Sequence, residues 1–388
     1  MKLHRSLPQR AALPVRDEQN SGIVTWFHRA LPLVLIISAW NWIGPTSVIA
    51  SELKSDEKVV FYPAMARRVR GGIELELHGL VYEPGQHALL ARALRRAIGI
   101  DEEDVTPAEA ALFRERIEYF LVDNERKKKF SVRIGGAVRE LNSSTANGHF
   151  TTRLSLRDGE FPLLPTIGGD TNFVLSVEIP TSRGRFRSVP LEVHLLGETG
   201  LSIISDIDDT IKISDVRDRH ALVHNTFCRP FTPVPGMAGV YRSWATNGAW
   251  FHYVTAGPWQ LYLPLAEFTR GNGFPAGTFF MKTFRIKDSS FLALFSSPER
   301  YKPGVIEKLL KEFPRRQFVL VGDSGEKDPE IFGALARNHP RQIHSIFIRD
   351  VTGEPANAAR YQRAFTNVPV GTWQIFREPA EMRALPAP

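Results

Sequence analysis

Three carboxylates directly follow an apolar segment of the sequence, at a spacing suited to catalysis. Leu201–Ser205 is typical of a buried strand, and Asp206, Asp208 and Asp209 come immediately after it. Carboxylates in such a place are costly unless a cation compensates their charge. Asp206 and Asp208 stand two apart where the strand ends, so one could attack phosphorus while the other moves protons. Alone, this pattern more often marks an acidic surface turn or a helix N-cap.

A second apolar segment also ends in an acid. Phe318–Val321 leads into Gly322 and Asp323, and Asp328 follows five positions later. Asp323 would complete a cation site with Asp206, while Asp328 would hold the loop or bind a water of the metal. Mg²⁺ takes few protein oxygens and keeps waters that a phosphate can replace, so these acids predict Mg²⁺ as a cofactor. The alternative is a turn followed by an N-cap at Asp328.

Two further positions are suited to holding a phosphoryl group. Thr255 follows the apolar segment Trp250–Val254, and a hydroxyl with free backbone N–H groups at a strand-to-helix turn can bind phosphate. Lys302 precedes Pro303 at a predicted helix start, where a cation can neutralise a transferring phosphoryl group. Each signal is weak alone, because threonine is a common helix cap and surface lysines are abundant.

In their order and spacing, these residues resemble the four motifs of the haloacid dehalogenase (HAD) phosphohydrolases. The strings around them are similar to the catalytic domain of the actin-patch type of Mg²⁺-dependent phosphatidate phosphatases. That resemblance covers roughly residues 195–375. The strings that carry it are 205–212 (SDIDDTIK), 257–261 (GPWQL), 322–330 (GDSGEKDPE) and 346–351 (IFIRDV).

The resemblance implies a role for each motif residue. Asp206 would be the nucleophile that forms an aspartyl-phosphate, and Asp208 would protonate the leaving alcohol and then activate water. Asp206, the backbone carbonyl of Asp208, and Asp323 would bind Mg²⁺. Thr255 and Lys302 would hold the phosphoryl oxygens.

The elements that position these residues change in character along the chain. Residues 51–196 hold alternating strands with turns at short intervals, which predicts a β-sandwich, and helical spacing at 87–98 and 107–122 predicts a helical insertion. Beyond Leu201, strands alternate with helices, which predicts an α/β, HAD-like Rossmannoid domain whose parallel sheet carries the site at its carboxyl edge. We therefore expect a β domain over 51–196, a catalytic domain over 197–375 and a tail over 376–388.

The first fifty residues predict export or membrane anchoring. No charged residue stands between Ala30 and Ser51, and small residues suited to cleavage precede Ser51. If the segment is retained, about 20 residues are enough to span a bilayer. A buried soluble helix is disfavoured because no polar face interrupts the run. We expect a periplasmic protein, or one anchored by this segment.

Composition restricts the class of protein and its partners. Hydrophobic residues make up 43% and charged residues 23%, which excludes a disordered or polytopic membrane chain. The single Cys228 excludes a disulfide framework and a cysteine-ligated zinc site. The net charge of +7 favours anionic partners such as phosphate esters or acidic lipid. Without residues 1–50, which carry five basic and two acidic residues, the charge would be +4, which is too slight to argue for nucleic acid.

The short segments between the motifs predict an open site. Neither the residues between Thr210 and Pro233 nor those of 283–301 are long enough for a lid domain. An open site suits phosphatidic acid or another phosphate ester presented at a membrane surface. Trp259 could lie at the headgroup boundary or pack beneath the helix that follows it. The possible aromatic rim, at least half of it expected in the core, is Phe227, Phe231, Trp259, Phe291, Phe295 and Tyr301.

The predicted activity is hydrolysis of phosphatidic acid to diacylglycerol. Two alternatives stay open. One is a phosphatase of the same fold that acts on phosphoprotein or another bulky phosphomonoester. The other is a catalytically silent binding scaffold, which the intact acidic motifs disfavour.

Overall fold

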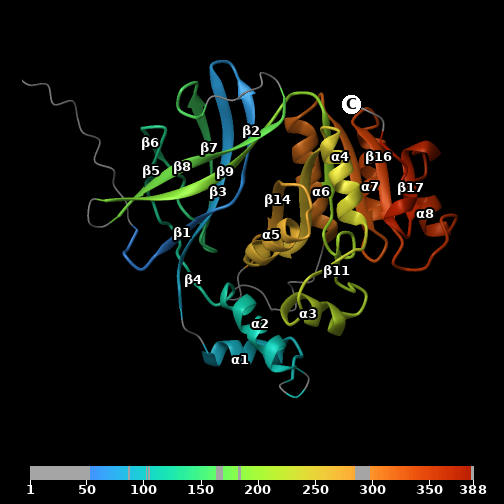
Figure 1. Ribbon diagram of the computed structural model, residues 1–388, viewed down its shortest axis with the longest axis horizontal. Coiled ribbons are helices and arrows are strands. Elements are labelled where there is room, and N and C mark those ends of the chain that lie inside the picture. The colour runs from blue at the N-terminus through green and yellow to red at the C-terminus, as the bar shows by residue number, and fades with distance from the viewer. Residues whose placement is uncertain are drawn as a thin grey trace, which may run out of the picture. The chain divides into compact units, whose positions relative to one another are not determined.

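The structure is a computed structural model that describes residues 53–385, with gaps at 86–87, 102, 104, 163–168, 182–184 and 285–297 (Figure 1). The predicted export segment lies outside the described residues. What the structure describes belongs to one compact unit, Val48–Pro388. Among the described residues, no helix has the length and apolar character needed to cross a membrane.

The first part of the unit is rich in β-strands, as predicted. Its central strand β3 pairs with β1 and β2 along one edge and with β7 along the other. With 12 residues, β3 also pairs with β4, and β2 continues the pairing to β9, β8, β5 and β6, so the nine strands form one hydrogen-bonded network. The strands are β1 (Lys58–Phe61), β2 (Ala64–Val69), β3 (Gly72–Glu83), β4 (Asp123–Asn124), β5 (Ser131–Ile134), β6 (Ala137–Glu140), β7 (His149–Arg157), β8 (Thr171–Pro180) and β9 (Phe186–Leu196).

The predicted helical insertion is present between β3 and β4. It consists of α1 (Ala88–Ala97) and α2 (Pro107–Glu118), and α2 ends four residues before the predicted end. A capping box starts α2, with Thr106 as the N-cap and Pro107 in the first turn. The buried Arg116 donates to the carbonyls of Thr226 and Arg229, and this fixes the insertion against α3 (Arg219–Phe227; Figure 1).

The second part contains the predicted parallel sheet. The strand order is β14-β13-β10-β15-β16-β17, and every neighbouring pair is parallel. The strands are β10 (Leu201–Ser205), β13 (Trp250–Pro258), β14 (Gly277–Lys282), β15 (Gln317–Asp323), β16 (Ile343–Arg349) and β17 (Trp373–Phe376). A short pair, β11 (Lys212–Ile213) and β12 (Thr232–Pro233), brackets α3.

Helices cover both faces of this sheet (Figure 1). Successive strand residues face opposite sides, so Ile203 joins one apolar cluster and Ile204 another. The first cluster includes residues of α4 and α5, and the second includes residues of α6, α7 and α8. The helices are α4 (Met237–Thr246), α5 (Tyr262–Gly271), α6 (Pro298–Glu312), α7 (Asp328–Asn338) and α8 (Ala359–Ala364).

One predicted helix start is wrong. Helix α6 begins at Pro298, so Lys302 lies inside the helix and Pro303 follows it there. Proline is favoured at the first helical position, where its missing N–H needs no partner. The prediction gave that role to Pro303, but the helix begins five residues earlier.

Trp259 packs inside the protein, which decides between its two predicted roles. Only 7% of its surface is exposed, and its ring lies 4.3 Å from that of Tyr62 and 4.6 Å from that of His78, between ring centroids. Tyr262 lies against the same rings. Trp259 therefore joins the turn after Thr255 to the β-rich part and is not part of an exposed rim.

We predict that Trp259→Ala lowers the melting temperature markedly. Replacing a buried tryptophan by alanine typically costs about 3–5 kcal/mol. Thermal unfolding followed by circular dichroism measures this, with Leu263→Ala as the control because Leu263 is 41% exposed. An unchanged melting temperature for Trp259→Ala would contradict the packing role.

Candidate active site

The carboxyl ends of three neighbouring strands bring the predicted site residues together. Strands β13, β10 and β15 lie side by side, and they lead to Thr255, Asp206 and Asp323. The backbone N–H of Asp206 donates to the carbonyl of Val321 at 2.8 Å, which extends the ladder into the site. The predicted clustering at this edge of the sheet is therefore observed.

A buried lysine lies at the centre of the acidic side chains. The Nζ atom of Lys302 lies 2.8 Å from Asp206 Oδ1, 2.7 Å from Asp328 Oδ1 and 2.9 Å from Glu326 Oε2. Lys302 is 1% exposed. Burial alone would lower the pKa of Lys302, but these carboxylates raise it well above its ordinary value. The ammonium group therefore stays charged and offsets part of the acidic charge.

Asp323 has a carboxylate oxygen suited to a cation. Its Oδ1 accepts the N–H groups of Gly325 at 2.6 Å and Glu326 at 3.2 Å. Its Oδ2 is buried and has no hydrogen-bond partner among the described residues. Burial and the neighbouring Asp328, against the opposing effect of Lys302, raise the pKa of Asp323 well above its ordinary value. A buried, unpaired carboxylate oxygen is unfavourable until a cation or a proton joins it.

The oxygen donors around this atom fit Mg²⁺. Carboxylate oxygens of Asp206, Asp323 and Asp328 all lie within 4.8 Å of one another. Burial, despite Lys302, raises the pKa of Asp206 well above its ordinary value as well. All-oxygen sites suit hard cations such as Mg²⁺.

Asp328 is held by the protein through both carboxylate oxygens. Oδ1 contacts Lys302, and Oδ2 accepts the backbone N–H of Asp323 at 3.3 Å. A Cβ at position 322 would collide with this carboxylate, so Gly322 leaves the room that Asp328 occupies. Of its two predicted roles, this geometry favours holding the loop.

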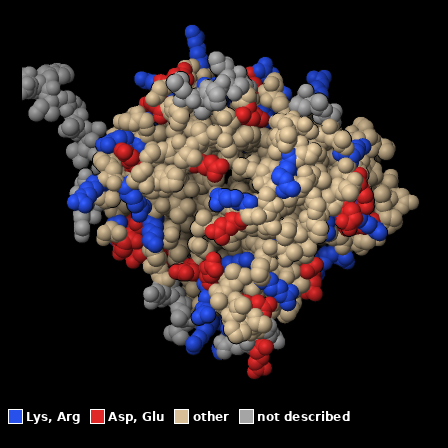
Figure 2. Space-filling view, in the orientation of Figure 1, with Lys and Arg blue, Asp and Glu red and all other residues tan. Residues whose placement is uncertain are grey.

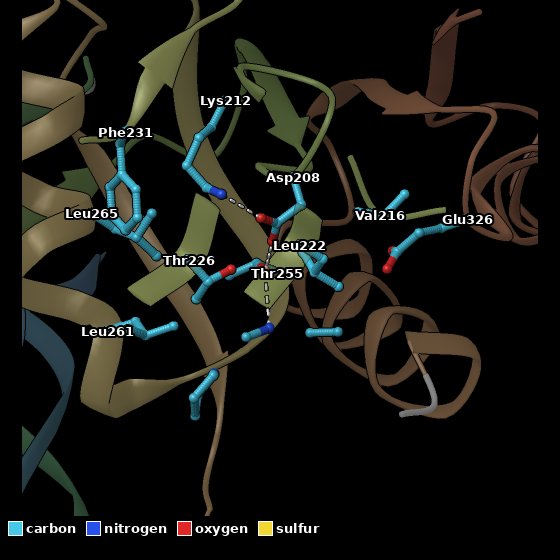
Figure 3. Close-up of a pocket in the computed structure, with 13 residues that line it drawn as sticks. Asp208, Lys212, Val216, Leu222, Thr226, Phe231, Thr255, Leu261, Leu265 and Glu326 are labelled. Atoms are coloured by element: carbon cyan, nitrogen blue, oxygen red, sulfur yellow. Dashed lines mark hydrogen bonds and ion pairs between the residues drawn. The ribbon is translucent and has the colours of Figure 1, made fainter. Parts of the chain in front are cut away.

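The carboxylate of Asp208 points to a different set of partners (Figure 3). Its Oδ1 lies 2.8 Å from Lys212 Nζ and 2.7 Å from Ser214 Oγ, while Oδ2 accepts the Thr255 hydroxyl at 3.1 Å. Burial would raise the pKa of Asp208, but the Lys212 charge and these hydrogen bonds lower it below its ordinary value. Asp208 is thus separated from the carboxylates around Lys302, and only its backbone carbonyl remains a predicted metal ligand.

Several residues that shape the site were not predicted. The side chain of Asp209, whose φ is 53°, accepts the backbone N–H groups of Ser214, Asp215 and Val216. Lys212 and Ser214 hold Asp208. The strings that carry the resemblance contain Asp209 and Lys212, but a linear pattern does not show which carboxylate a side chain will reach.

A pocket of about 100 Å³ lies beside Asp208 and Thr255 (Figure 3). Among the described members of the predicted aromatic rim, only Phe231 lines it. Phe227 and Trp259 are buried, Tyr301 is half-buried, and Phe291 and Phe295 lie outside the described residues. Basic and acidic side chains border a hollow near the middle of the face in Figure 2.

The part of the chain that contains these site residues matches a known protein family. Residues 201–350 match the family described as "Phosphatidate phosphatase APP1, catalytic domain". This part of the chain is thus similar to the APP1-type phosphatases. It holds Asp206, Asp208, Thr255, Lys302, Asp323 and Asp328.

Two curated fungal proteins are similar to this chain. Phosphatidate phosphatase APP1 of Saccharomyces cerevisiae is 28% identical over 310 residues, which cover 74% of this chain and 47% of the relative. A protein of Schizosaccharomyces pombe described as uncharacterized is 29% identical over 180 residues, covering 45% of this chain and 29% of the relative. The chain thus spans less than half the length of the curated relatives that it matches.

The similarity extends beyond the segment predicted from the motifs. Residues 195–375 make up less than half of the 388-residue chain, whereas the alignment with the Saccharomyces protein covers 74% of it. The alignment therefore includes part of the β-rich segment. Among solved structures, a chain of the Pnkp1/Rnl/Hen1 complex aligns with a TM-score of 0.28 at 13% identity, over 44% of this chain and 55% of that chain. This last similarity is too low to assign a fold.

We predict that Asp323→Asn raises the melting temperature of the metal-free protein and removes the increase caused by Mg²⁺. Asparagine keeps an oxygen for the N–H groups of Gly325 and Glu326 but removes one of the crowded negative charges. Because the pKa of Asp323 is raised in the folded state, metal-free stability should fall as pH rises through that pKa, and the variant should lose part of this fall.

Thermal unfolding with and without Mg²⁺ measures both effects. The matched control is Asp158→Asn, which removes an exposed carboxylate. A lower metal-free melting temperature for Asp323→Asn, with the Mg²⁺ effect intact, would contradict the assignment of Asp323 to a cation site.

Proposed function

We propose that this protein is a Mg²⁺-dependent phosphatidate phosphatase of the HAD type, with residues 197–375 as its catalytic domain. It hydrolyses phosphatidic acid to diacylglycerol and phosphate through an aspartyl-phosphate. The observation that carries the proposal is the buried contact of 2.8 Å between Lys302 and Asp206 at the carboxyl edge of the sheet. The match of residues 201–350 to the APP1-type catalytic domain and the similarity to the Saccharomyces phosphatidate phosphatase support the choice of substrate.

Asp206 is the nucleophile in this proposal. Lys302 contacts its Oδ1, and the Thr210 hydroxyl donates to its Oδ2 at 3.1 Å, so the carboxylate is held in one orientation. An Asp206 oxygen attacks phosphorus, and the bond between phosphorus and the ester oxygen breaks. Lys302 then neutralises charge on the transferring phosphoryl group.

Asp208 acts first as the general acid and then as the general base in this proposal. Negative charge of the substrate phosphate beside Asp208 favours its protonated form. It gives this proton to the departing glycerol oxygen. The ionised Asp208 then takes a proton from the water that attacks the aspartyl-phosphate, which releases phosphate and frees Asp206. Thr255 and Lys212 keep the Asp208 carboxylate in place through both steps.

The proposed metal ligands are Asp206, Asp323 and the backbone carbonyl of Asp208. Bound Mg²⁺ would supply positive charge that neutralises the phosphate oxygens. The unpaired Asp323 Oδ2 supports this assignment. Asp328 and Gly322 keep the strand end and its loop in position.

The proposed partner is phosphatidic acid or a similar ester at a membrane surface, and no nucleic acid is proposed. Export or anchoring by residues 1–50 is part of the proposal, which would place the site outside the cytoplasm.

We predict that Asp206→Asn abolishes phosphate release while the fold persists, because an amide is a poor nucleophile. Asp208→Asn should lower kcat by about 10²–10⁴-fold through loss of acid–base catalysis. The assay is phosphate release from phosphatidate in mixed micelles, with Mg²⁺ and with a chelator, and Asp158→Asn is again the control.

The outcome separates the proposal from its alternatives. Release from phosphopeptides but not from phosphatidate would favour the phosphoprotein phosphatase. Absence of Mg²⁺-dependent release from any phosphomonoester would favour the silent scaffold. Near-normal activity of Asp206→Asn would contradict the covalent mechanism.

A further inference from the structure

The pocket beside Asp208 has one polar end and a longer apolar wall. Asp208, Lys212 and Thr255 lie together at the polar end, while Thr226 and Glu326 are polar side chains elsewhere in the lining (Figure 3). Its volume of about 100 Å³ is several times the space that one water requires. The apolar wall comprises Val216, Leu222, Phe231, Pro258, Leu261 and Leu265.

The polar end marks where the reacting oxygen must lie. Asp208 gives its proton to the departing oxygen in the proposed mechanism, so that oxygen lies within hydrogen-bond reach of its carboxylate. Thr255 and Gly257 line the same pocket, and the Gly257 N–H donates to the Thr255 hydroxyl at 3.0 Å. The alcohol that leaves therefore extends from Asp208 into the space between α3 and α5.

The wall of this space favours hydrocarbon. Leu222 comes from α3, while Leu261 and Leu265 come from the turn before α5 and from α5 itself. A peptide in this place would give up hydrogen bonds to water and gain none from these side chains. A glycerol ester with its first methylene groups would instead remove apolar surface from water.

The α3 side of the pocket is held firmly enough to recognise shape. Arg116 of the insertion donates to the carbonyl of Thr226 at 2.7 Å, and its guanidinium lies 3.8 Å from the ring centroid of Phe231. The Asp209 carboxylate holds the backbone N–H of Val216 at 2.7 Å. These contacts come from residues outside the pocket and hold the chain on both sides of α3. The apolar lining of the pocket is therefore formed before substrate binds.

We propose that this pocket binds the part of the leaving alcohol next to the phosphate, namely the acylated glycerol, and so selects glycerolipid phosphates. The inference rests on the proposed function and adds the residues that determine specificity. Leu222 is the informative position, because it is half-buried and faces the pocket from α3.

The test compares Leu222→Trp, which fills the pocket, with Leu263→Trp on the exposed face of α5, outside the lining. With Mg²⁺ and dioleoyl phosphatidate in mixed micelles, Leu222→Trp should lower kcat/KM about tenfold or more, since differences of a methylene or more in apolar pockets have effects of this size. Inhibition by dioctanoylglycerol should weaken equally. The inhibition constant of inorganic phosphate should stay within about twofold, because phosphate occupies only the polar end.

A second variant covers the case in which Leu222→Trp does not fold. Leu222→Ala should weaken inhibition by dioctanoylglycerol without changing inhibition by phosphate. Equal effects of Leu222→Trp and Leu263→Trp, or parallel loss of phosphate inhibition, would overturn the pocket assignment while the phosphatase proposal stands. A wild-type protein that hydrolyses other phosphomonoesters but not phosphatidate would overturn both.

Discussion

The ammonium group of Lys302 lies among the buried carboxylates of Asp206 and Asp328 and the half-buried one of Glu326, and the site depends on these contacts. Acids buried at a strand end are unfavourable unless a cation offsets them. One lysine near Asp206, Asp323, Glu326 and Asp328 leaves the group negatively charged. We propose that a bound divalent cation offsets this remaining charge. The central position of β10 and β15 in the sheet is what brings these acids together.

Two acidic loops are kept apart by their own sets of contacts. Arg360 holds the loop after β15. Its guanidinium donates hydrogen bonds to the carbonyls of Ser324 and Glu326 and forms an ion pair with Glu330. The loop after β10 is held by the Asp209 carboxylate. This separation lets Asp206 face Lys302 while Asp208 faces Lys212, so the two carboxylates have different environments. Their pKa values shift in opposite directions: burial raises that of Asp206, while Lys212 and hydrogen bonds lower that of Asp208. The proposed roles need the reverse, which a bound cation beside Asp206 and a substrate phosphate beside Asp208 would supply.

The strands and the acids at their ends could be predicted from sequence because both leave local signals. Period-two alternation predicted β3, and the apolar segment 201–205 placed Asp206 at a strand end. Features set by distant partners left no such signal: the pairing that joins the nine strands and the burial of Trp259. Glu326 was missed for the same reason, since its partner Lys302 lies 24 residues away.

The most direct test of the account is to identify the residue that receives the phosphoryl group. Wild-type protein would be mixed with phosphatidate and Mg²⁺, quenched in acid within one turnover and analysed by peptide mass spectrometry. The account predicts a transient, acid-stable and alkali-labile acyl phosphate on Asp206 that is absent from Asp206→Asn. Phosphate release with label on another residue, or with none on a protein that turns over normally, would contradict it.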